Sequence, residues 1–160
     1  MSPHAATSAP SAGGPVAALD PGRSKCGLVL SDPARSMIRQ ALVLPPESAW
    51  NHLQHWHREG PLSLVVIGDG TGSEPWRRRI EDLVAVAMVN ERGTTLAARR
   101  RYWQLFPPRG WRRLLPEGLR HPSREWDDVV AQLLLERWLG RPLPRDPSLV
   151  VPRLRTQPAP

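Results

Sequence analysis

The chain has one cysteine, one lysine and no long apolar run, and each of these scarcities excludes a class of protein. Because Cys26 is alone, no disulfide can form within the chain, which agrees with a reducing cytoplasm. No apolar run approaches the roughly 18 residues that cross a bilayer, so we expect a soluble protein without a membrane partner. Residues 1–15 are rich in Ser, Ala, Pro and Gly and indicate a disordered tail rather than a secretory signal. The expected location is therefore cytoplasmic.

Positive charge is abundant, and nearly all of it is arginine because Lys25 is the only lysine. The formal net charge is +7 and the pI is about 11.2, a balance that favours a polyanionic partner. The planar guanidinium group suits phosphate, but a biased genome composition would produce the same enrichment equally well. Composition therefore permits a nucleic-acid partner without establishing one.

The apolar pattern confines a single domain to residues 16–140 of the 160. Five apolar runs predict strands, at residues 16–20, 27–31, 40–44, 62–67 and 84–89. The last two runs are continuous, which is typical of strands that are buried on both faces. Helical spacing predicts four helices, at residues 47–59, from 73 onward, at 95–106 and at 124–139, the last capped by Ser123. Residues 141–160 indicate a proline-rich tail without a core pattern.

The order of these elements predicts an α/β fold with a mixed five-stranded sheet and helices on both faces. The first three strands should form an antiparallel meander, while the first, fourth and fifth should be central and parallel. Parallel strands end at one edge of a sheet, and an open α/β sheet binds its ligand there. Asp20, Asp69 and Glu91 all stand at such strand ends.

A further acidic position, Asp127, lies in the last predicted helix. It shares a helical stripe with Ala131 and Leu134, so we expect it to point towards the sheet. Its neighbour Asp128 shares a stripe with Gln132 and Glu136 and is expected to face water. An inward carboxylate needs a metal ion, a cation or solvent beside it.

Carboxylate oxygens at one sheet edge suit Mg²⁺, which prefers oxygen ligands and usually keeps several waters. A pair of such ions can activate water and stabilise a leaving oxygen in phosphodiester hydrolysis. Without metal, like charges 4 Å apart repel by about 4 kcal/mol at an effective dielectric constant of 20, which raises a carboxyl pKa. Simpler roles stay open for each acid: a turn cap for Asp20, a helix cap for Glu91 and a salt bridge for Asp127.

Four short motifs follow one another along the chain, at residues 18–27, 66–73, 90–95 and 127–131. In this order they resemble the YqgF/RuvX-like family of RNase H-fold nucleases, which comprises pre-16S rRNA processing enzymes and proposed Holliday junction resolvases. The resemblance implies an RNase H-like nuclease domain over residues 16–140 and hydrolysis that depends on Mg²⁺ or Mn²⁺. It places Asp20, Glu91 and Asp127 at the catalytic, metal-binding positions. The family's usual acid pair is Asn90-Glu91 here, and Asp69 is the candidate replacement ligand.

Arginines and aromatic residues alternate between residues 99 and 113, a pattern that suits a phosphate backbone and unpaired bases. A solvated helix face would give the same pattern. The predicted nucleic-acid contacts are Arg23, Lys25, Arg92, Thr94, Arg109, Trp111, Arg112 and Arg113.

By the family resemblance, the expected substrate of this endonuclease is RNA, notably a ribosomal RNA precursor, with branched DNA as the second choice. The chain is expected to act as a monomer or a homodimer. The rival interpretation is a catalytically weak RNA-binding or ribosome-assembly module, because Asn90 replaces an acid and the loop arginines remain. Fold-level analogy does not choose between RNA and branched DNA as the substrate.

Overall fold

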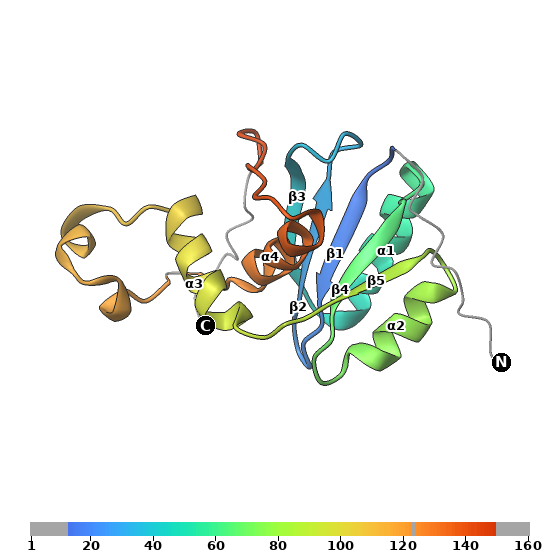
Figure 1. Cartoon of the computed structure of the whole chain (residues 1–160), viewed down its shortest axis with the longest axis horizontal. Coiled ribbons are helices and arrows are strands. Elements are labelled where there is room, and N and C mark those ends of the chain that lie inside the picture. The colour runs from blue at the N-terminus through green and yellow to red at the C-terminus, as the bar shows by residue number, and fades with distance from the viewer. Residues whose placement is uncertain (1–12, 123, 150–160) are drawn as a thin grey trace, which may run out of the picture.

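A mixed five-stranded sheet forms the centre of the computed structural model, which describes residues 13–122 and 124–149 (Figure 1). Its strands are β1 (Val16–Asp20), β2 (Cys26–Ser31), β3 (Ile38–Leu44), β4 (Leu64–Gly68) and β5 (Val86–Val89), in the order β3-β2-β1-β4-β5. The first three strands pair antiparallel, and β1, β4 and β5 pair parallel. The predicted meander and the parallel strands are confirmed.

The described residues form four α-helices: α1 (Pro46–Glu59), α2 (Ser73–Glu81), α3 (Thr94–Leu105) and α4 (Asp127–Leu139). Helices α1 and α2 lie on one face, whereas α4 lies across the other and contacts every strand (Figure 1). Helix α3 packs on α4 rather than on the sheet. Two short 3₁₀ helices, Gly110–Leu114 and Glu117–Leu119, lie between α3 and α4. None of the helices in the described ranges is long and apolar enough to cross a membrane.

Strand β1 is buried on both faces, and its residues alternate between two hydrophobic cores. Val16 and Ala18 belong to the core under α4, while Ala17 and Leu19 belong to the core under α1 and α2. Because side chains of a strand alternate with a period of two, Asp20 continues the series that faces α4. By the same alternation, a side chain at Gly27 on β2 or at Gly68 on β4 would point towards α4.

Strand β5 departs from its expected place in the middle of the sheet. It is the last strand in the order and is only partly buried, with Met88 exposed. A run of apolar residues does not distinguish an edge strand that one helix covers from a central strand. The core therefore centres on β1 and β4.

The segment that follows α4 also differs from the expected tail. Leu143 is fully buried in the core under α4. The N–H of Ile38 donates to the carbonyl of Pro144 at 2.8 Å, and the N–H of Asp146 donates to the carbonyl of Ile38 at 2.8 Å. The packed domain therefore continues past residue 140. Residues 1–12 and 150–160 of the expected tails, and the expected cap Ser123, lie outside the described residues.

Candidate active site

Asp20 ends β1 between two glycines on the neighbouring strands. Its register partner on β2 is Gly27. On the other side, Leu19 pairs with Ile67, so the next position on β4 beside Asp20 is Gly68. Neither neighbour has a side chain, and space is left on the α4 face of the sheet on both sides of the carboxylate.

The space over Gly68 is filled by the Glu91 side chain, which comes from the β5–α3 loop. A Cβ atom on Gly68 would overlap the Glu91 carboxylate, and one on Gly70 would lie 2.8 Å from Glu91 Cδ. The backbone N–H of Glu91 donates to Asp69 Oδ1 at 2.9 Å. Glycine at these two positions is therefore what lets Glu91 reach towards Asp20, and Asp69 fixes the Glu91 backbone.

The space over Gly27 is filled by the start of α4. A Cβ atom on Gly27 would overlap the carbonyl of Asp127 and would lie 2.8 Å from the N atom of Asp128. Asp127 is partly buried there. The first turn of α4 therefore lies directly against β2, with the backbone of Asp127 at the contact.

These contacts place three carboxylates in one electrostatic site. Burial raises the pKa of Asp20 from 3.8 to about 7, and repulsion from Glu91 and then from Asp127 adds to the shift. Burial also raises the pKa of Glu91, with a further contribution from Asp69. None of Asp20, Glu91 and Asp127 forms an ion pair with any residue in the described ranges. The salt bridge that was an open alternative for Asp127 is therefore not made there.

All three groups are carboxylates from separate elements, and carboxylate oxygens are the donors that a hard divalent cation prefers. Within residues 13–122 and 124–149, no three His, Cys, Asp or Glu side chains already have the mutual geometry of a ligand set. The thiol of Cys26 is buried beside the site, and burial raises its pKa. It is therefore a neutral apolar neighbour of the carboxylates rather than a thiolate.

The loop that carries Glu91 is held by several polar contacts. The Thr94 hydroxyl donates to the Glu91 carbonyl at 2.5 Å, and the N–H of Arg92 donates to Asn90 Oδ1 at 2.7 Å. From α4, Arg137 Nη1 donates to the Asn90 carbonyl at 2.7 Å. Thr94, which was predicted to contact nucleic acid, is buried, and its hydroxyl holds the Glu91 carbonyl. Asn90 closes a turn through its side chain.

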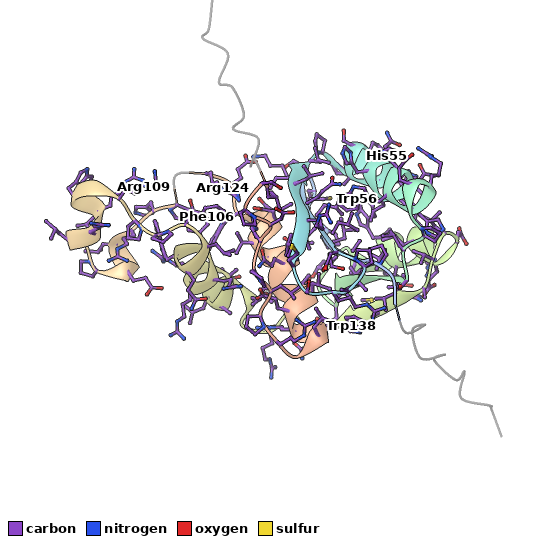
Figure 2. The ribbon with its side chains drawn as sticks, turned by 90° about the horizontal axis from the view of Figure 1, so that it is seen from above. His55, Trp56, Phe106, Arg109, Arg124 and Trp138 are labelled. Carbon is purple, nitrogen blue, oxygen red and sulfur yellow. The ribbon has the colours of Figure 1, made fainter. Side chains whose placement is uncertain are left out.

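The other predicted nucleic-acid contacts divide into two groups. Arg23 and Lys25 lie exposed in the β1–β2 turn, directly after Asp20, and Lys25 pairs with Glu125. Arg92 is exposed next to Glu91. The second group, Arg109, Trp111, Arg112 and Arg113, lies in the segment between α3 and α4, which projects from the sheet (Figure 1). Figure 2 shows Arg109 on this projecting side, with His55 at the opposite end of the molecule.

Asp128 was expected to face water, and that prediction is wrong. Its relative exposure is 1%, and two arginines neutralise it: Arg124 Nη2 at 2.7 Å and Arg145 Nη1 at 2.9 Å from Oδ2. The Arg145 side chain reaches it from the segment after α4. Because this partner lies far along the chain, helical spacing alone could not reveal the buried pair.

Glu136 continues this buried polar stripe on α4. It accepts hydrogen bonds from Arg101 Nη2 at 2.8 Å, from the N–H of Leu143 at 2.9 Å and from Gln132 Nε2 at 3.0 Å. Both Gln132 and Glu136 are buried, so the expectation of a solvated face is wrong for them as well. This network fastens α4 to α3 and to the segment that pairs with β3.

No protein-family model matches the chain, and no curated protein matches its sequence. The candidate site therefore depends on its own geometry. Gly27 and Gly68 lie within the motifs given above but were not predicted as site residues. Their role is to leave space beside Asp20. A glycine beside a strand-end acid is the signal for this role, but it can be recognised only when the strand register is known.

Proposed function

We propose that the protein is a divalent-metal-dependent phosphodiester hydrolase with an RNase H-like fold that acts on nucleic acid. The observation that carries this proposal is Asp20, held between two glycines with its pKa raised to about 7 by burial and by the nearby Glu91 and Asp127. Uncompensated carboxylates in one place destabilise a fold, so such a cluster is favoured where a cation completes it. The meander followed by parallel strands agrees with an RNase H-like sheet.

In the proposed site, Asp20, Glu91 and Asp127 hold the cation, and Asp69 keeps Glu91 in place. A bound Mg²⁺ or Mn²⁺ supplies positive charge that offsets the repulsion and polarises the phosphodiester for attack by water. Because burial, Glu91 and Asp127 raise its pKa to about 7, the Asp20 carboxyl is partly protonated at neutral pH in the metal-free protein. It releases this proton when a cation binds beside it. The exposed Arg23 and Arg92 at the rim bind the substrate phosphates.

RNA, in particular a ribosomal RNA precursor, is the preferred substrate, and branched DNA is the second. This preference comes from the motif resemblance, and the net charge of +7 supports either polyanion. One observation favours a second function, nucleic-acid binding without hydrolysis. The Asn90 side chain closes a turn at 2.7 Å from the N–H of Arg92 and adds no carboxylate to the cluster.

A cleavage assay separates the two functions. The full-length protein is incubated with labelled RNA and with four-way-junction DNA, with Mg²⁺, with Mn²⁺ and with chelator. We expect cutting that needs metal and that falls on the order of 1000-fold in Asp20→Asn, equal to about 4 kcal/mol of transition-state stabilisation.

The matched control is Asp82→Asn, the same substitution at an exposed acid at the end of α2. This variant should cut like the wild type. Metal-independent cutting, or equal cutting by Asp20→Asn and the wild type, would contradict the proposal. Tight binding without cutting of either substrate would favour the binding module.

A further inference from the structure

A segment between α3 and α4 projects away from the sheet, and we call residues 107–122 the arm (Figure 1). It leaves α3 after Phe106 and leads back to Asp127, the first residue of α4. It contains the two 3₁₀ helices and no buried residue. Because α4 begins beside Asp20, the arm is continuous in the chain with the candidate active site.

The arm exposes large apolar side chains. Trp111 is 70% exposed, Leu114 is 87% exposed and Leu119 is 62% exposed. Only two other large apolar residues in the described ranges are exposed, Met88 and Leu96. Three of the five exposed large apolar side chains in the described ranges thus belong to this one short segment.

Two arginines, one from α3 and one from the arm, bind backbone carbonyls of the arm. Arg99 Nη2, from α3, donates to the carbonyls of Gly118 at 2.8 Å and Arg120 at 3.1 Å. Arg120 Nε donates to the carbonyl of Leu115 at 2.8 Å, and its guanidinium lies 6.0 Å from the centre of the Trp103 ring. The arm is therefore held by its own contacts, which lowers the entropy that binding would cost.

Three other arginines, Arg109, Arg112 and Arg113, are exposed and form no ion pair within the described part of the chain. The arm contains a single acid, Glu117, against four arginines, so its formal charge is +3 with His121 neutral. Cationic groups thus flank the exposed indole of Trp111. That combination is complementary to a chain of phosphates with bases beside it.

We propose that the arm binds an unpaired stretch of nucleic acid, with Trp111 stacked on a base and Arg109, Arg112 and Arg113 on the phosphates. An indole face accepts any base, and a base is available for stacking only where it is unpaired. This inference extends the proposed function, because it makes the substrate one whose unpaired segment continues from the active site to the arm. An acidic protein and an anionic membrane are the competing partners, and the experiment includes both.

The test measures binding in chelator, so that no cutting takes place. Fluorescence anisotropy compares a labelled 12-nucleotide single strand, as RNA and as DNA, with a duplex of the same sequence. We expect Trp111→Ala to weaken binding of the single strands about tenfold and of the duplex less than twofold. Arg109→Ser/Arg112→Ser/Arg113→Ser should reduce the slope of log affinity against log salt by about 2 for single strands.

The controls remove similar groups elsewhere. Leu96→Ala removes an exposed apolar side chain from α3, and Arg39→Ser/Arg58→Ser/Arg78→Ser removes the same charge from β3, α1 and α2. Both should retain wild-type affinity within about twofold, and melting temperatures check that all variants fold.

Unchanged single-strand binding by Trp111→Ala would overturn the proposal, and so would equal loss of salt dependence in the two arginine variants. Trp111-dependent binding to vesicles of anionic lipid or to poly-glutamate, with unchanged binding to single strands, would also overturn it. Because no metal is present, arm-dependent binding can be found even if the cleavage assay fails. If the protein cleaves its substrate but the arm variants bind single strands like the wild type, the proposal for the arm is overturned and the proposed function is not.

Discussion

Asp127 and Asp128 are neighbours in the chain, yet the structure gives their charges opposite surroundings. Asp128 is buried between Arg124 and Arg145, with oxygen–nitrogen distances of 2.7 and 2.9 Å. Asp127 has no ion pair among the described residues, and its charge helps to raise the pKa of Asp20. Asp128 is thus both buried and neutralised by arginines, whereas Asp127 is partly buried and keeps an uncompensated charge beside Asp20.

Each arrangement has a physical reason to persist. Removing one partner of a buried ion pair strongly destabilises the folded protein, because the other charge stays buried without a partner. The carboxylates around Asp20 are held together by the backbone: Gly27 admits the start of α4, and Gly68 admits Glu91. The rest of the fold therefore imposes a repulsion that a divalent cation can relieve.

The largest expected effect comes from exchanging each of the two acids for its amide. Asp128→Asn should lower the free energy of unfolding by about 3–5 kcal/mol, because it leaves Arg145 charged and buried. Asp127→Asn should change the free energy of unfolding by less than about 0.5 kcal/mol and should reduce metal-dependent cleavage on the order of 1000-fold. Urea denaturation and the cleavage assay measure the two quantities. Equal destabilisation by the two variants would remove the distinction between the acids.

The glycines offer a second way to separate structure from chemistry. In Gly27→Ala the new methyl group meets the backbone of Asp127, which cannot swing away, so we expect a loss of about 1–3 kcal/mol in stability. In Gly68→Ala the methyl group meets the end of the Glu91 side chain, which can move. That variant should lose less than about 1 kcal/mol but should bind Mn²⁺ at least about tenfold more weakly. Calorimetric titration with Mn²⁺ checks it, and unchanged affinity would show that Glu91 is not a ligand.

A third expected effect is a pH dependence of the metal-free protein. The pKa of Asp20 is raised from 3.8 to about 7, so the folded state binds this proton more tightly than the unfolded chain does. Its contribution to stability is fully present below pH 4 and is lost as the pH rises through 7. The wild type should therefore lose stability relative to Asp20→Asn between pH 4 and 7, by at most about 1.4 kcal/mol per pH unit. Denaturation curves in chelator give this difference, and parallel curves for the two proteins would show that the Asp20 pKa is not raised.

Much of the fold could be predicted from local sequence, because its signals are local. Alternating and continuous apolar runs located every strand to within a few residues, and strand ends located Asp20 and Glu91. What failed depended on distant partners. The burial of Asp128 requires Arg145, and the packing of Leu143 requires β3 and α4 to be assembled. The role of Gly68 requires the β1–β4 register, which no short pattern contains.

The most direct test of the central claim is a crystal of the full-length protein soaked in Mn²⁺, with the ion located by its anomalous scattering. We expect a peak about 2 Å from a carboxylate oxygen of Asp20, with Glu91 and Asp127 turned towards it. A Mn²⁺-saturated crystal with no peak among these three side chains, and with each of them paired to an arginine instead, would contradict it.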